Sequence, residues 1–198
     1  ITIPNTITYI SSNCVYGCAK LKTIYVPASV TQIGENAFFS SCTSLENIFV
    51  DSQNQHYTSV DGILYNKDKT VLMTCPNAKK FESFTVPYGV TTIADSAFEF
   101  HEELTTLIMP QTVTKVERFA FFSCINLSNV TFSKNLSVIE MSAFGSCDLS
   151  GLLTLPDSLT YLEFSAFGSN YGLTEVYIPK NLYYIGSGAF SSCYYMNK

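Results

Sequence analysis

An Ala-Phe pair returns along the chain at a nearly constant interval, and this interval limits the possible folds more than any other feature. The pairs begin at Ala37, Ala97, Ala120, Ala143, Ala166 and Ala189, and the last five are each 23 residues apart. A period between about 20 and 50 residues is typical of solenoids, in which each repeat buries its apolar side against its neighbours. The sequence therefore predicts a stack of similar rungs.

The same series of residues surrounds each Ala-Phe pair. A proline precedes the rung, aliphatic residues follow three and six positions later, and a cysteine usually comes shortly after the pair. Each rung closes with Leu-x-x-Ile-x-Val or a close variant, as in Leu21, Ile24 and Val26. The prolines are Pro4, Pro27, Pro87, Pro110, Pro156 and Pro179, and Asp51 and Ser133 take their place in two rungs. This alignment gives about eight rungs, the third expanded and the last cut short.

Two segments of each rung have the pattern of β-strands. The closing segment alternates apolar and outward residues, which is typical of a half-buried strand, and proline ends it because proline cannot donate to a β-ladder. The Val-Thr-x-Ile stretch favours a second extended segment, since a β-branched residue recurs at its outward position. We therefore predict a β-rich solenoid with little helix beyond a short turn at each Ala-Phe-x-x-Cys.

The third rung is longer than the others. The step from Asp51 to Pro87 is 36 residues instead of 23. Residues 60–65 and 70–74 have strand composition and flank a four-residue turn, so we predict a β-hairpin within an insertion over residues 52–80. Insertions in solenoids often contribute to binding. The apolar residues of the hairpin favour the simpler interpretation that it covers the edge of the core.

The repeat resembles a known family. The pattern Ile-x-Ile-Pro-x-x-Val-Thr-x-Ile-Gly-x-x-Ala-Phe-x-x-Cys-x-x-Leu is similar to the BspA-like leucine-rich repeats, also called treponemal-type repeats, and residues 26–42 follow it almost residue for residue. The resemblance covers essentially the whole chain, and residues 57–68 resemble an insert seen in such arrays. It implies a right-handed leucine-rich-repeat superhelix in a cell-surface protein that adheres to host matrix proteins, host cells or other microbes.

Composition excludes several classes of function. Hydrophobic residues make up 46% of the 198-residue chain, charged residues only 14%, and the net charge is −5. No basic cluster is present to neutralise phosphates, so we expect no nucleic-acid partner. No apolar run reaches the roughly 18 residues of a membrane span. We expect a single leucine-rich-repeat domain over residues 1–198. Because neither end of the sequence shows a polar cap, we expect this domain to be a fragment of a longer array.

The seven cysteines predict structural thiols. Five of them, Cys18, Cys42, Cys124, Cys147 and Cys193, share one rung position. His101 replaces cysteine at that position in one rung, and Asn170 in another. A buried thiol behaves as a small hydrophobe, and no second pair at zinc-finger spacing follows Cys14 and Cys18. We therefore expect neither a metal site nor a cofactor.

No residue pattern indicates catalysis. Of the two histidines, His101 lies at the cysteine position of its rung and is expected in the core, whereas His56 is expected in a solvated loop. Neither a nucleophile elbow, a phosphate loop nor a calcium-loop spacing is found. We therefore expect a non-enzymatic protein with no catalytic residue.

One row of outward residues on the closing segments is the candidate binding surface. Aromatic and aliphatic residues on a solenoid face are what protein interfaces favour, although much of any protein surface is apolar. We hypothesise that Tyr25, Phe49, Ile108, Thr131 and Tyr177 bind a protein, with Tyr25 and Phe49 central. The complete row is Tyr25, Phe49, Thr85, Ile108, Thr131, Thr154 and Tyr177, and a second row on the other extended segments is Tyr9, Gln32, Thr92, Lys115, Val138, Tyr161 and Tyr184.

Cell-surface adhesion through protein binding, for example to host extracellular matrix, is thus the expected function. One alternative is a carbohydrate-binding module that uses the tyrosines as stacking platforms. Another is an intracellular interaction scaffold, which free thiols permit because disulfides mark oxidising compartments. Asn126, Asn129 and Asn135 begin triplets that fit the glycosylation pattern, which matters only in a eukaryotic secreted protein.

Overall fold

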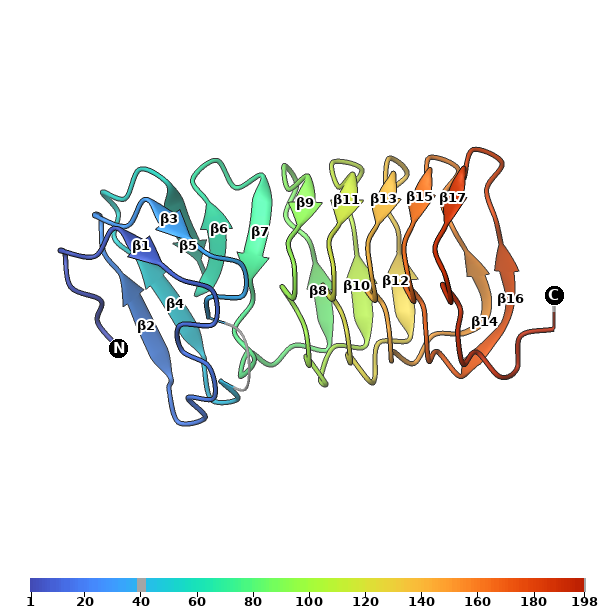
Figure 1. The fold of residues 1–198 in the computed structure, drawn as a ribbon, viewed down its shortest axis with the longest axis horizontal. Helices are drawn as coiled ribbons and strands as arrows, with labels where there is room; N and C mark the ends of the chain where they lie inside the picture. Colours follow the sequence, from blue (N-terminus) through green and yellow to red (C-terminus); the bar gives the residue numbers. More distant parts are fainter. Residues whose placement is uncertain (39–41, 198) are drawn as a thin grey trace. The chain divides into compact units, whose positions relative to one another are not determined.

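The computed structural model describes residues 1–38 and 42–197 (Figure 1). The described residues form β-strands, turns and loops and contain no helix, as predicted. The chain divides into two compact units, Ile1–Lys80 (unit 1) and Phe81–Lys198 (unit 2). Each unit is a stretch of β-solenoid. The single domain predicted over residues 1–198 stays a prediction.

The described residues of unit 1 form seven strands. The strands are β1 (Tyr9–Ile10), β2 (Thr23–Val26), β3 (Gln32–Ile33), β4 (Asn47–Val50), β5 (Tyr57–Val60), β6 (Ile63–Asn66) and β7 (Val71–Thr74). The second extended segment of each regular rung forms a short strand, hereafter a second strand, and the second strands β1 and β3 pair in parallel. The longer closing strands β2 and β4 also pair in parallel. The insertion contributes the antiparallel strands β5, β6 and β7.

Unit 2 repeats the two strand types in a regular alternation. The second strands β9, β11, β13, β15 and β17 form one parallel ladder, and the closing strands form two separate parallel sheets, β8-β10-β12 and β14-β16. The strands are β8 (Ser83–Thr85), β9 (Thr92–Ile93), β10 (Thr106–Ile108), β11 (Lys115–Val116), β12 (Asn129–Thr131), β13 (Val138–Ile139), β14 (Ser150–Thr154), β15 (Tyr161–Leu162), β16 (Gly172–Tyr177) and β17 (Tyr184–Ile185).

The Ala-Phe corner is a tight turn with two left-handed residues. Among the described residues, the residue before each alanine of these pairs and the residue before each cysteine position have positive φ, for example Ser142 (53°) and Ser146 (57°). Gly188 occupies the first of these positions in the last rung, with φ 61°. Glycine is the residue that adopts this conformation most easily, so the serines elsewhere are held there by the packing of the rung.

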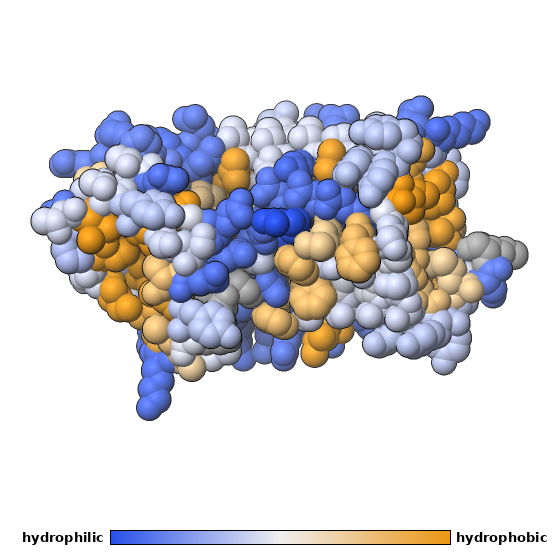
Figure 2. Space-filling model, viewed as in Figure 1, coloured by the Kyte–Doolittle hydropathy of each residue, from blue (hydrophilic) through white to orange (hydrophobic). Residues whose placement is uncertain are grey.

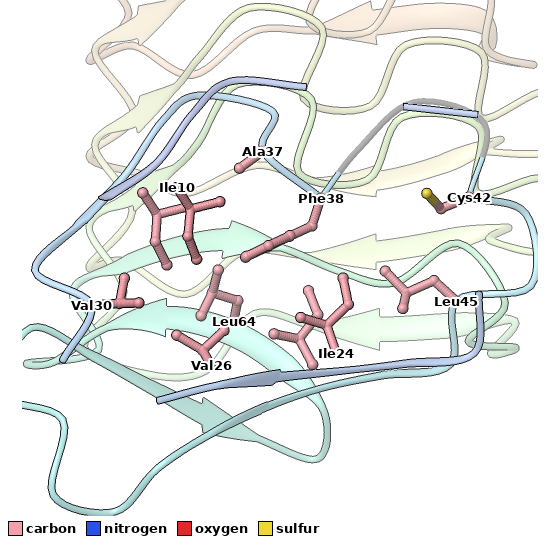
Figure 3. Packing of buried hydrophobic residues seen from close by; sticks show 11 residues of the cluster. Ile10, Ile24, Val26, Val30, Ala37, Phe38, Cys42, Leu45 and Leu64 are labelled. Atoms are coloured by element: carbon pink, nitrogen blue, oxygen red, sulfur yellow. The ribbon is translucent and has the colours of Figure 1, made fainter. Parts of the chain in front are cut away.

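The phenylalanines of the Ala-Phe pairs form the centre of the core. In unit 1, Phe38 lies among Ile10, Ile24 and Leu64, and all four side chains are buried (Figure 3). In unit 2 the rings stack face to face, with centroid distances of 5.1–5.7 Å and interplanar angles of 7–14°. The stacked rings are Phe98, Phe121, Phe144, Phe167 and Phe190.

The cysteine position has a polar role as well as an apolar one. The Cys124 thiol donates to the Phe98 carbonyl at 3.1 Å, and the Cys147 thiol donates to the Phe121 carbonyl at 3.3 Å. Asn170 replaces cysteine by donating its amide to the Phe144 carbonyl at 2.8 Å. Each of these side chains therefore satisfies a buried carbonyl of the preceding rung. Cys18 differs from the prediction, because its side chain is exposed in the first rung.

The expanded rung forms three antiparallel strands. The predicted hairpin is present, because β6 and β7 pair antiparallel. Its first strand begins at Ile63 instead of residue 60, because Asp61 and Gly62 both have positive φ and form a two-residue turn between β5 and β6. Asp-Gly is the typical sequence for such a turn. A side chain on Gly62 would meet the Asn47 backbone at 3.1 Å, so glycine is also required sterically. Ile63, Leu64 and Leu72 are buried, so the hairpin covers core residues.

Candidate protein-binding surface

The outward row predicted on the closing strands, hereafter the closing-strand row, is exposed in both units. In unit 1 Tyr25 pairs in register with Phe49. In unit 2 Thr85, Ile108 and Thr131 share one register position, and Thr154 pairs with Tyr177. Alternation along a strand sends these side chains away from the core, and all of them are exposed. The structure therefore brings Tyr25 and Phe49 together in unit 1, and Ile108 and Thr131 together in unit 2.

Tyr25 and Phe49 form the most pronounced aromatic surface of unit 1. Their rings stack at a centroid distance of 5.4 Å with an interplanar angle of 30°, and 49% and 41% of the two residues remain exposed. Stacking fixes both rings, so little side-chain entropy is lost when a partner covers them. Two adjacent, pre-ordered aromatic side chains have the character of an interface anchor.

A hollow of about 240 Å³ lies beside these two rings. The residues that line it include the apolar Ile3, Val26 and Pro27 and the polar Asn5 and Asp51. An apolar lining with a few polar groups is the usual arrangement of a pocket that accepts a partner's anchoring side chain. The sequence pattern did not indicate Asn5 or Asp51 as surface-site residues, because Asn5 lies in a turn and Asp51 takes the proline position directly after β4.

The second row has a different character. Tyr161 and Tyr184 stack at 4.5 Å with an interplanar angle of 12°, so each ring covers a face of the other. Lys115 forms ion pairs with Glu117 at 3.0 Å and with Glu140 at 2.7 Å. A sugar-binding tyrosine offers a free ring face to its ligand, and stacking between the tyrosines reduces that free face. This row is therefore less suited than the closing-strand row to large apolar contact.

In two of the three glycosylation triplets, the asparagine side chain donates a hydrogen bond to the preceding rung. The side-chain amide of Asn126 donates to the Glu102 carbonyl at 2.7 Å, and that of Asn135 donates to the Gln111 carbonyl at 2.9 Å. Asn129 is exposed at the start of β12, and its amide donates to the neighbouring Ser128 hydroxyl at 3.2 Å. A glycan on Asn126 or Asn135 would compete with a hydrogen bond between rungs.

Several titratable side chains are buried or half-buried, and burial shifts the pKa of some of them. Burial raises the pKa of the Cys124 thiol to about 12 and that of Cys147 well above its usual range, so neither thiol is a nucleophile at neutral pH. His101 is buried and stacks on Phe81 at 5.9 Å, and His56 is exposed, as predicted for both. Burial, together with the charge of Asp95, raises the pKa of Glu99 to about 7.

Hydrophobic residues also reach the surface outside the closing-strand row. Figure 2 shows one face of the molecule, on which hydrophobic and hydrophilic areas alternate. In unit 1, the exposed Ile1 and Ile7 border a hollow of about 330 Å³ with Val15 and Phe38. Within residues 1–38 and 42–197, no group of His, Cys, Asp and Glu is arranged to hold a metal ion. A helix long and apolar enough to cross a membrane is likewise absent from that part of the chain.

The chain is similar to several solved structures of leucine-rich repeat proteins from bacteria. A leucine-rich cell surface protein from Faecalibacterium prausnitzii is 31% identical, with a TM-score of 0.86 over 98% of this chain and 51% of its own. The pneumococcal vaccine antigen PcpA is 25% identical, with a TM-score of 0.80 over 100% of this chain and 55% of its own. A leucine-rich repeat protein from Eubacterium ventriosum shares the fold, at 24% identity and a TM-score of 0.73 over 97% of this chain and 64% of its own.

This chain thus spans about half the length of the first two of these proteins. No curated protein matches it. The model of the BspA type leucine-rich repeat region matches six copies over residues 1–66 and 69–197, which is nearly the whole sequence. The Ala-Phe corners, the thiol position and the two strand types described above are the structural counterparts of that repeat. The chain therefore belongs to the BspA type leucine-rich repeat family.

Proposed function

We propose that this chain is a non-enzymatic adhesion module of a cell-surface protein, which binds another protein through its closing-strand row. The single observation that carries the proposal is the stacked, exposed pair Tyr25 and Phe49 beside the 240 Å³ hollow. Membership of a family of repeat scaffolds supports protein binding in general. The name of the F. prausnitzii relative supports a location at the cell surface.

A host extracellular matrix protein is the proposed partner class. Tyr25 and Phe49 would act as anchors, and Ile108, Thr131 and Tyr177 would add contacts in unit 2. Changing both Tyr25→Ser and Phe49→Ser should weaken binding to a responsive matrix protein at least tenfold, because each anchor contributes about 1–2 kcal/mol. Binding is measured by biolayer interferometry on immobilised fibronectin, laminin and collagen.

The matched control changes two tyrosines outside the row. Tyr88 and Tyr183 are both 77% exposed, so Tyr88→Ser with Tyr183→Ser removes at least as much exposed aromatic surface as the first double variant. The control should bind like the unmodified chain. Equal loss in both double variants, or no loss in the first, would refute the assignment of the row.

A carbohydrate ligand is the second candidate, supported by the many exposed tyrosines of unit 2, such as Tyr171 and Tyr194. These two rings stack on each other at 5.5 Å and 6°, which leaves one free ring face at each end of the pair. A glycan array distinguishes the candidates, since saturable glycan binding that is lost on Tyr194→Ala favours the carbohydrate function.

A further inference from the structure

The ladder of closing strands in unit 2 is interrupted at one place. A backbone N–H just after each closing strand normally donates to a carbonyl of the next rung. This bond joins Val86 to Ile108 at 2.9 Å, Met109 to Thr131 at 2.9 Å and Leu155 to Tyr177 at 3.4 Å. Within the described part of unit 2, the equivalent bond from Phe132 to Thr154 is missing, and β12 and β14 belong to separate sheets. Figure 1 shows these two strands separated.

Two local sequence features accompany the interruption. Leu149 and Leu153 are four residues apart, whereas Leu127 and Val130 of the previous rung are three residues apart. The register of β14 and β16 shifts between Gly151 and Leu152, where Thr174 of β16 is skipped in the pairing, and Gly151 has a φ of 68°. A bulge of this kind bends the strands locally.

Phe132 adds bulk at the same place. Its ring lies edge-on against Phe144 at 5.6 Å and against Phe167 at 6.2 Å, both at 82°. The residue at the equivalent position of the preceding rung is the slimmer Met109, which is only 4% exposed, whereas Phe132 is half-buried.

The interruption leaves a hollow of about 400 Å³ along the whole length of the two strands. Its walls are residues 128–132 on one side and residues 149–154, without Gly151, on the other, together with Leu173. Val130 is half-buried, whereas its counterpart Leu107 is fully buried. The volume is in the range of sites that accept ligands.

Main-chain groups of both walls face this hollow. Successive residues of a strand point their N–H and C=O groups to alternate sides. The Thr131 carbonyl accepts from the Met109 N–H, on the side of β10, and the Leu155 N–H donates to the Tyr177 carbonyl of β16. The N–H and C=O groups of the adjacent residues Val130 and Thr154 therefore point the opposite way, toward each other's strand. Open strand edges of this kind are templates for another strand.

We propose that the hollow between β12 and β14 is a docking slot for one extended peptide segment of a partner protein, hydrogen-bonded through its main chain to both walls. An extended peptide presents donors and acceptors on both of its edges, as in strand addition to a sheet. Leu152, which is 59% exposed, supplies an apolar contact at the rim. The slot lies in unit 2 and is independent of the proposed role of Tyr25 and Phe49.

The test uses a fluorescein-labelled synthetic peptide with the sequence of residues 104–110. In the structure this sequence pairs through β10 with a parallel strand on each side. Fluorescence anisotropy should show saturable binding to the chain. The same peptide N-methylated at the positions of Leu107 and Ile108 loses one donor on each edge, and it should bind at least tenfold more weakly.

A matched pair of protein variants locates the binding. Ser150→Trp places a large side chain in the wall of the slot and should weaken peptide binding at least tenfold. Ser83→Trp changes an exposed serine at the start of another closing strand and should have no effect. The Tyr25→Ser, Phe49→Ser double variant should also bind the peptide normally, which separates this proposal from the adhesion surface.

Hydrogen exchange provides a second readout on the unmodified chain. The amide protons of Val130, Phe132 and Thr154 should exchange at least tenfold more slowly with saturating peptide. Absence of saturable binding, equal binding of the N-methylated peptide, or unchanged exchange at these three amides would each overturn the proposal. So would peptide binding by a folded Ser150→Trp variant that equals that of the unmodified chain.

Discussion

At the scale of single residues, buried polar side chains form hydrogen bonds with main-chain groups of their own rung and of the neighbouring rung. Asn54 is fully buried, and its amide donates to the carbonyls of Pro27 and Val30 at 2.8 and 2.9 Å. Its side-chain oxygen accepts from the N–H groups of His56 and Tyr57 at 2.8 and 2.9 Å. One side chain thus satisfies four main-chain groups where the regular repeat gives way to the insertion.

Replacing Asn54 with alanine should therefore be strongly destabilising. Asn54→Ala leaves two carbonyls and two N–H groups without partners, so we expect a loss of about 3 kcal/mol in the free energy of unfolding. This loss is measured by urea denaturation, with unfolding monitored by circular dichroism. Gln53→Ala, at the exposed neighbouring position, should cost less than about 0.5 kcal/mol. A loss below about 1 kcal/mol for Asn54→Ala would contradict this role.

Glu99 should make stability depend on pH. Its pKa is raised from the ordinary 4.5 to about 7, mainly by burial, so the folded state retains a proton that the unfolded state releases. Stability should therefore fall as the pH rises from about 4.5 through 7. Because Glu99 is half-exposed, solvent screening reduces the effect to the order of 1 kcal/mol. Glu99→Gln should flatten the profile of unfolding free energy against pH, and an unchanged profile would exclude Glu99 as its source.

At the scale of elements, the phenylalanine stack and the strand ladders hold neighbouring rungs together. Phe121 lies between Phe98 at 5.1 Å and Phe144 at 5.2 Å and is fully buried. Hydroxyl groups add hydrogen bonds beside the second strands. The Thr114 hydroxyl donates to the Thr91 carbonyl at 3.3 Å, and the Thr160 hydroxyl donates to the Ser137 carbonyl at 3.1 Å. Each rung therefore depends directly on its immediate neighbours.

Truncating one ring of the stack should destabilise unit 2. Phe121→Ala creates a cavity between two rings, so we expect a loss of about 3–5 kcal/mol in the free energy of unfolding. Phe100→Ala, which removes a ring that is 46% exposed, should cost far less. Chemical denaturation of both variants provides the measurement, and similar losses would show that stacking does not dominate the stability of these rungs.

At the scale of the whole molecule, cysteines occur along most of the chain and differ in their burial. None of the seven cysteines, all of which lie in the described part of the chain, forms a disulfide bond. Cys14 and Cys18 are exposed, and the buried cysteines are Cys42, Cys75, Cys124, Cys147 and Cys193. Burial raises the pKa of the Cys42 and Cys193 thiols and, more strongly, those of Cys124 and Cys147, so these thiols are protected by low thiolate content as well as by poor access.

Mass spectrometry after alkylation tests this division of the thiols. In the native chain at neutral pH, we expect rapid modification of Cys14 and Cys18 only. In concentrated guanidinium chloride without reductant, all seven should be modified. Fewer than seven modified thiols would reveal a disulfide, and rapid native modification of Cys124 would contradict its burial.

The repeat sequence by itself determined the solenoid. The spacing of the Ala-Phe pairs predicted the buried phenylalanines, and period-two alternation predicted that Tyr25, Phe49 and Ile108 would be exposed. Such predictions succeed because each position of a rung has the same surroundings in every copy. The protein-binding role of the closing-strand row remains a prediction.

The tertiary structure alone decided the features that depart from the repeat. The Asp61-Gly62 turn, the four hydrogen bonds of Asn54 and the opening between β12 and β14 depend on which groups meet across rungs. Pairing Tyr25 with Phe49 beside a hollow likewise required the register of two strands. Periodicity fixes which side of a strand a residue occupies, whereas contacts between copies depend on the bulk and hydrogen bonds of each particular neighbour.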